Sequence, residues 1–372
     1  MLKADLPALT GIRALAAIWV ISLHFQDVWE ILFPPLVLVR PLIAAGNYGV
    51  DLFFLLSGLI MMHVYAAVRP FRWRDYRDFL GRRLARIYPA YLAAFFFMIG
   101  LVLAANFAGV PMSTEMYPPS SLWREAFMLQ AWGAPVLSWN YPAWSVSAEW
   151  FAYLAVFPLA LLCHHRLGDL SPLRRAFTAI VIIFGAIATL RLATPDGDLP
   201  HALIRVSTEF FAGAMLYHLL RALCGHPRLA DALVMFSILL LGLACWFPAG
   251  TMGTGILTLS SLVFGLLGLG ESRSLSARVL AASPWVYLGT ISYSLYLIHA
   301  PMQRILKVVL PVERFAESSI GLRCAVFAVH LCALFLAAAC LYHFVEDPAR
   351  RYFVTRLSRR KSAGAPCNSS GG

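Results

Sequence analysis

The apolar run TGIRALAAIWVISLHF (residues 10–25) contains two side chains that can do chemistry, Arg13 and His24. They are eleven positions apart, so a helix turning about 100° per residue places both on one face, about 16 Å apart along its axis. A polar group at membrane depth normally faces a cavity or a partner, because burying it in lipid costs several kcal/mol. The spacing therefore predicts an anion-binding guanidinium at one end of a helix face and an imidazole for proton transfer at the other.

Three further titratable residues lie in apolar runs, namely Asp51 in NYGVDLFFLLSGLIMMH, Glu149 in WSVSAEWFAYL and His299 in ISYSLYLIHAP. Counting along each run places all three near the depth of His24. We expect Asp51 and Glu149 to assist catalysis, since a carboxylate beside an imidazole can fix its tautomer and stabilise its cation. Tyr296 shares a helical face with His299, and both are candidates for binding the acceptor.

A second set of basic residues lies in RPFRWRDYRDFLGRRLARIYPAY, where Arg83 and Arg86 stand one helical turn apart at the foot of an apolar run. Two neighbouring guanidinium groups suit a phosphate group. The alternative is that these arginines only fix topology. With Arg13 they would form an anion-binding level below an acid–base level that contains His24.

The composition indicates which elements carry these residues. The chain is 60% hydrophobic and 13% charged, with a mean hydropathy of +0.72. These values predict an all-α integral membrane protein. About ten apolar runs are long enough to span a bilayer. They cover residues 7–26, 47–68, 87–109, 144–163, 176–194, 202–222, 230–248, 252–270, 285–309 and 319–345.

The basic residues predict the orientation of these spans. With the N-terminus in the cytoplasm, most of the 30 Lys and Arg residues fall in cytoplasmic segments, and ten spans return the C-terminus to that side. The net charge of +11 is then a topology signal, and we expect no nucleic-acid partner. We predict a transmembrane domain over residues 1–350 and a basic, disordered cytoplasmic tail over 351–372.

The longest outer loop could form a lid, and the spacing of the cysteines gives no indication of a metal centre. The longest outer loop, about 110–143, is rich in Trp, Pro and Tyr and leads to Trp144. Such a surface could stack on sugar rings, so Trp144 is a third candidate for acceptor binding, although an ordinary interfacial aromatic belt explains the loop equally well. The seven cysteines are scattered without a CxxC pair, and no metal is expected.

The two levels together fit an acyl transfer. An extended coenzyme A arm is on the order of 20 Å long, similar to the rise between Arg13 and His24. An acyl-CoA could leave its phosphates on the inner arginines while its thioester reaches His24, which would deprotonate an acceptor hydroxyl or carry the acyl group. A transporter or flippase with a buried proton relay is the leading alternative, and a non-catalytic scaffold is a third.

Six segments in order make the chain resemble the membrane-bound acyltransferase 3 family. They are LTGIRALAAIWVISLHF, in which Arg13 and His24 match the family's basic-x10-His motif, GVDLFFLLSG, RRLARIYPAY, in which Arg83 and Arg86 match its Arg-x-x-Arg element, WSVSAEW, ISYSLYLIH and VEDPARR. The resemblance covers most of the chain, and the order of the segments is more specific than any one of them.

The resemblance implies a ten-helix bundle in the bacterial inner membrane, with both termini cytoplasmic. It implies an acyl-CoA donor, usually acetyl-CoA, a carbohydrate acceptor and a central catalytic role for His24. Some relatives carry a fused extracytoplasmic esterase-like domain. We expect a stand-alone form here, which acts alone or passes the acyl group to a separate extracytoplasmic transfer partner.

Overall fold

The computed structural model describes residues 6–68, 72–110, 116–133, 138–193, 202–248 and 251–363, and every regular element within these ranges is helical. This confirms the predicted all-α class. The helices, in chain order, are α1 (Pro7–His24), α2 (Gln26–Leu32), α3 (Arg40–Ala44), α4 (Tyr48–Tyr65), α5 (Trp73–Phe107), α6 (Leu122–Ala126), α7 (Trp144–Phe151), α8 (Phe157–Leu167), α9 (Pro172–Ala193), α10 (Ala202–Leu223), α11 (Pro227–Ala244), α12 (Met252–Leu269), α13 (Leu275–Leu280), α14 (Ser283–Val309), α15 (Ile320–Leu341) and α16 (Asp347–Ala363). π-Helical turns join α7 to α8 (Ala152–Val156) and α15 to α16 (Tyr342–Glu346).

Eight stretches of the described chain are helical, long and apolar enough to cross a membrane. They are α1, α4, α5, the α7–α8 stretch, α9, α11, α12 and the α15–α16 stretch, which supports a multi-pass membrane protein. The other two predicted spans are also helices, α10 and α14, but both carry polar side chains that face the interior of the bundle. The count of ten spans and the cytoplasmic termini therefore remain predictions.

Glycines allow the helices that carry the polar residues to approach closely. A Cβ atom on Gly289 of α14 would lie 1.8 Å from the Thr10 carbonyl oxygen of α1. A Cβ atom on Gly58 of α4 would lie 2.0 Å from the Phe210 carbonyl oxygen of α10, so glycine permits a close helix contact there. These two contacts bring α1 against α14 and α4 against α10.

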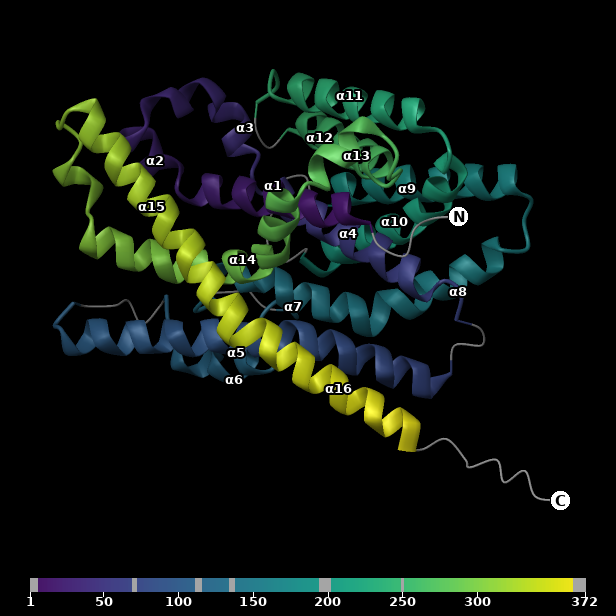
Figure 1. Cartoon of the computed structure of the whole chain (residues 1–372), viewed down its shortest axis with the longest axis horizontal. Helices are drawn as coiled ribbons and strands as arrows, with labels where there is room; N and C mark the ends of the chain where they lie inside the picture. The colour runs from purple at the N-terminus through teal and green to yellow at the C-terminus, as the bar shows by residue number, and fades with distance from the viewer. Residues whose placement is uncertain are drawn as a thin grey trace.

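The C-terminal helix extends past the predicted domain boundary at residue 350. Figure 1 shows α15 and α16 as one continuous rod that passes across α14 and α5. The Leu357 side chain on α16 lies close to Gly81 on α5, where an added Cβ would be 3.3 Å from it. Residues 351–363 of the predicted tail are thus helical, while 364–372 lie outside the described residues.

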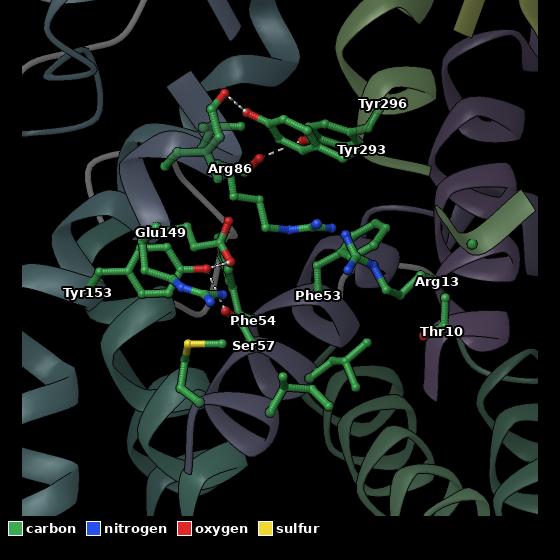
Figure 2. A pocket seen from close by; sticks show the side chains of 18 of the residues that line it. Thr10, Arg13, Phe53, Phe54, Ser57, Arg86, Glu149, Tyr153, Tyr293 and Tyr296 are labelled. Atoms are coloured by element: carbon green, nitrogen blue, oxygen red, sulfur yellow. Dashed lines mark hydrogen bonds between the residues drawn. The ribbon is translucent and has the colours of Figure 1, made fainter. Parts of the chain in front are cut away.

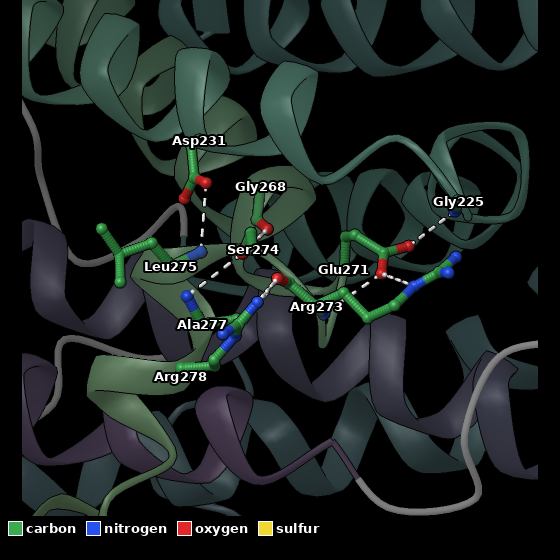
Figure 3. Close-up of polar contacts among 9 residues, drawn as sticks. All are labelled: Gly225, Asp231, Gly268, Glu271, Arg273, Ser274, Leu275, Ala277 and Arg278. Atoms are coloured by element: carbon green, nitrogen blue, oxygen red, sulfur yellow. Dashed lines mark hydrogen bonds and ion pairs between the residues drawn. The ribbon is translucent and has the colours of Figure 1, made fainter.

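A polar cluster connects the ends of α10, α11, α12 and α13 (Figure 3). Glu271 accepts hydrogen bonds from the backbone N–H groups of Gly225 (2.8 Å) and Arg273 (3.1 Å), and Ser274 caps α13 by accepting from the Ala277 N–H (3.1 Å). Asp231 accepts from the Leu275 N–H at 3.0 Å. These contacts satisfy helix-end donors, so the cluster has a structural role.

Candidate functional site

A cavity of about 530 Å³ lies inside the bundle, between walls contributed by α1, α4, α5, α7, α14 and α16. Its polar lining joins residues far apart in the sequence (Figure 2). They are Thr10, Arg13, Ser57, Arg82, Arg83, Arg86, Ser145, Glu149, Tyr153, Thr290, Tyr293, Tyr296 and Arg350. The volume is in the range of pockets that hold cofactors and drug-sized ligands.

The structure brings Arg13, Arg83 and Arg86 to this one cavity. In the described part of the chain none of the three forms a salt bridge, and the Nε atoms of Arg13 and Arg83 are buried without a hydrogen-bond partner. Figure 2 shows the side chains of Arg13 and Arg86 pointing toward each other across the cavity. Guanidinium groups that face one another repel unless an anion lies between them, so the cavity is suited to an anionic ligand.

Two further arginines line the cavity and were not among the predicted site residues. Arg82 precedes Arg83 on α5, and Arg350 is contributed by α16. Arg350 also donates to Asp347 at 2.6 Å. The segment VEDPARR contained the signal for Arg350, but only the packing of α16 against α5 shows that this arginine reaches the cavity.

Glu149 lines the same cavity as Arg13, whereas His24 is not among the lining residues. It accepts a hydrogen bond from the Tyr153 hydroxyl at 2.6 Å. Because that hydroxyl has one hydrogen, Ser57 must donate to the Tyr153 oxygen, 3.0 Å away. The segment before α7 lies inside the bundle, where Asn140 donates to the Leu297 carbonyl at 2.9 Å.

His24 and His299 meet at a second position, where their rings stack with centroids 5.3 Å apart and an interplanar angle of 21°. The Tyr141 ring stands edge-on to His24, at 4.8 Å. Gln303 accepts from the Tyr141 hydroxyl at 3.3 Å and donates to the His24 carbonyl oxygen, so it ties the two segments together. Both histidines were predicted to lie at the same depth. Tyr141 and Gln303 were not predicted, although Gln303 lies one helical turn beyond His299.

Tyr296 lies between the cavity and the histidine pair. Its side chain lines the cavity, and its ring centroid is 5.7 Å from that of His299. Its hydroxyl donates to the Pro142 carbonyl at 2.8 Å and lies 2.7 Å from the Ser145 Oγ. His24 and His299 are not among the residues that line the cavity, so Tyr296 forms the wall between the two positions.

Asp51 does not contact His24, which corrects the predicted carboxylate–imidazole pair. Its carboxylate accepts two hydrogen bonds from Arg205 on α10, one of them from Nε at 2.9 Å. Glu209 completes the cluster, 3.8 Å from the Arg205 Nε. The Arg205 guanidinium also lies over the Trp144 ring, 5.6 Å from its centroid. Asp51 and Trp144 therefore belong to a charge cluster between α4, α7 and α10.

No group of three or more His, Cys, Asp or Glu side chains that could hold a metal ion is found among the described residues. The six cysteines that the structure describes are free thiols.

Glu125 anchors the segment that presents Tyr141. It is fully buried on α6, accepts from the Trp139 N–H at 2.7 Å, and has an Oε2 atom without a hydrogen-bond partner. Burial raises the pKa of this carboxyl from 4.5 to about 7. Since the folded state favours the protonated acid, its contribution to stability is complete below pH 4.5 and is lost as the pH rises through about 7.

We therefore expect hydrogen exchange in residues 116–133 and 138–143 to become faster as the pH rises past the pKa of Glu125. Glu125→Gln keeps an acceptor for the Trp139 N–H but cannot ionise, so it should remove this pH dependence after correction for intrinsic exchange. Hydrogen-exchange mass spectrometry on both sides of the pKa measures the effect. An identical pH dependence in the parent protein and the variant would contradict it.

Comparison with known proteins adds an independent finding. The family model described as "Acyltransferase domain" of acyltransferase 3 matches residues 6–342. "Putative peptidoglycan O-acetyltransferase YrhL" of Bacillus subtilis is 26% identical over 95% of this chain and 56% of its own length. "O-acetyltransferase OatA" of Staphylococcus aureus is 23% identical over 93% and 57%. "Acyltransferase MdmB" of Streptomyces mycarofaciens is 28% identical over 51% and 46%. The chain thus spans about half the length of these relatives. No solved structure matches it.

Proposed function

Because the chain belongs to the acyltransferase 3 family, we propose that it is a membrane-bound O-acyltransferase that moves an acyl group, most simply acetyl, from acyl-CoA to a hydroxyl of a cell-surface or secreted glycan. The names of OatA and YrhL support acetyl as the group, and the word peptidoglycan in the name of YrhL supports a glycan as the acceptor.

The observation that carries the proposal is that Arg13, Arg83 and Arg86 line one cavity, with the Nε atoms of Arg13 and Arg83 buried and without a hydrogen-bond partner among the described residues. Coenzyme A is an anion with several phosphates, and arginine binds phosphate through paired, charge-assisted hydrogen bonds. Arg82, Arg83 and Arg86 on α5 would hold the phosphates, and Arg13 would complete the positive field deeper in the cavity. Glu149 and Tyr153 form a polar wall that would orient the donor.

His24 is the proposed catalytic residue, either as general base or as transient carrier of the acyl group. Arg13 and His24 lie on one helix, so a donor bound at Arg13 points along α1 toward the histidine pair. The acyl end would pass Phe53 and Tyr296, which border the cavity on this side. Tyr296 is thus a residue that the reacting groups would touch.

The acceptor hydroxyl would approach from the side of Tyr141 and His299. We place the acyltransferase domain at residues 1–350 in a bacterial inner membrane, with the arginine end of the cavity toward the cytoplasm and the histidine pair toward the cell exterior. A separate extracytoplasmic protein could take part in the transfer. No nucleic acid or metal enters the proposed reaction.

The donor part of the proposal is tested by binding. Arg83→Gln should raise the Kd for acetyl-CoA about 10- to 100-fold, because a hydrogen bond to a charged group contributes about 1.5–3 kcal/mol. Binding of labelled acetyl-CoA to the purified protein in lipid nanodiscs measures this. Arg278→Gln is the matched control, since Arg278 donates to the Arg273 carbonyl outside the cavity. Equal Kd values for Arg83→Gln and the parent protein would exclude Arg83 from the donor site.

A further inference from the structure

His299 has its two ring nitrogens in different environments. The residue is completely buried. Its Nδ1 atom lies 2.6 Å from the Tyr296 carbonyl oxygen, one helical turn earlier on α14. Its Nε2 atom is buried and has no hydrogen-bond partner in the described part of the chain. A buried polar atom without a partner is uncommon in folded proteins, and a catalytic role is one of the explanations for such an atom.

The hydrogen bond at Nδ1 fixes the tautomer of the neutral ring. A carbonyl oxygen can only accept, so Nδ1 must carry the hydrogen. The neutral ring has a single N–H, and Nε2 therefore has a free lone pair. The Tyr296 carbonyl would also stabilise the imidazolium formed when Nε2 gains a proton. His299 is thus held as a base whose accepting atom is Nε2.

The position of this base is set by His24. The two rings are stacked at 5.3 Å, and Tyr141 stands edge-on to both, 5.8 Å from the His299 centroid. A hydroxyl group that approaches an acyl group near the His24 ring would therefore also be close to His299. Stacking holds the rings nearly parallel, so the relative position of the two histidines is defined before any substrate is bound.

We propose that His299 Nε2 is the general base that removes the proton of the acceptor hydroxyl, while His24 carries the acyl group. This assignment rests on the proposed acyltransferase function. It also has a chemical reason. While a ring nitrogen of His24 is bonded to the acyl carbon and the other bears hydrogen, His24 has no lone pair to accept a proton, so the second half of the reaction requires another base.

The bonds balance over two steps. First, a His24 ring nitrogen attacks the thioester carbonyl, the C–N bond forms, and the C–S bond breaks with its electron pair leaving on the CoA sulfur. Second, the acceptor oxygen bonds to the acyl carbon and the C–N bond breaks with its electron pair returning to His24. The hydroxyl proton moves to His299 Nε2 and then to the thiolate, which gives the ester and free CoA.

Two assays on the purified full chain in nanodiscs separate these steps. Exchange of label between free CoA and acetyl-CoA without acceptor reports the first step alone. The second assay measures transfer of labelled acetyl to the envelope glycan fraction that the parent protein labels. This transfer reports both steps together. His299→Gln should keep exchange within about threefold but lower transfer at least about 100-fold, the usual contribution of a general base. His24→Gln should abolish both activities.

The controls distinguish a base from a structural residue. His330→Gln replaces another buried histidine, whose ring contacts Phe25, and should leave both activities unchanged. Free imidazole should restore part of the transfer in His299→Ala, which also shows that this variant is folded. The assignment is overturned if His299→Gln retains transfer, if exchange and transfer fall together, if imidazole gives no rescue, or if the parent protein transfers acetyl without exchange. A parent protein that neither binds acetyl-CoA nor labels glycan would instead overturn the proposed function.

Discussion

Replacing His24 by Gln is expected to lower the rate of acetyl transfer at least about 1,000-fold while the protein remains folded. Gln fills a similar volume but has no basic nitrogen, so it can neither accept the hydroxyl proton nor form an acyl-imidazole. The His24 backbone carbonyl, which accepts from Gln303, is unchanged by the substitution. The effect should therefore fall on kcat and leave the Kd for acetyl-CoA nearly unaltered.

Transfer of label from acetyl-CoA to glycan measures the rate, and binding of labelled acetyl-CoA measures the Kd. His330→Gln serves as the control for loss of a buried imidazole on a neighbouring helix. A His24→Gln protein that transfers acetyl within tenfold of the parent rate would remove His24 from the mechanism. A loss of donor binding with the loss of activity would place His24 in the donor site instead.

The second large effect is on stability, and it concerns the Asp51–Arg205 ion pair. Both Asp51 and Glu209 are 2% exposed, and Arg205 is the cation that contacts them. Arg205→Met removes the positive charge beside these two buried carboxylates. Removing one partner of a buried ion pair lowers the free energy of unfolding by about 3–5 kcal/mol. We expect a large loss of thermal stability, which the double variant with Asp51→Asn should partly recover.

Thermal unfolding of the purified proteins in nanodiscs measures both variants. Asp51→Asn alone distinguishes two roles for Asp51. If Asp51 assists His24 in catalysis, this variant should lose activity at unchanged thermal stability. If Asp51 is a structural partner of Arg205, the variant should lose thermal stability first. If Arg205→Met unfolds at the same temperature as the parent protein, or if the double variant is no more stable than Arg205→Met, the charge cluster does not hold α4 to α10.

The helical repeat predicted which site residues share a face of the same helix. Arg13 and His24 lie on α1 at a spacing that fixes their common face, and Arg83 and Arg86 lie one turn apart on α5. All of these positions were obtained from the sequence. The family resemblance was also obtained there, because it depends on short motifs in a fixed order.

Contacts between helices could not be predicted in the same way. Arg205 is 154 residues from Asp51, and its choice of Asp51 as partner depends on the packing of α4 against α10. Arg350 reaches the cavity only because α16 continues as a helix along α5.

The central claim is that the chain transfers an acyl group from acyl-CoA to a glycan. The most direct test reconstitutes the purified protein in lipid vesicles with acetyl-CoA labelled in the acetyl group on one side and extracted envelope glycan on the other. We expect labelled glycan and one equivalent of free CoA for each acetyl transferred, with both lost in His24→Gln. Movement of glycan across the vesicle membrane without release of CoA would contradict it and would favour a transporter.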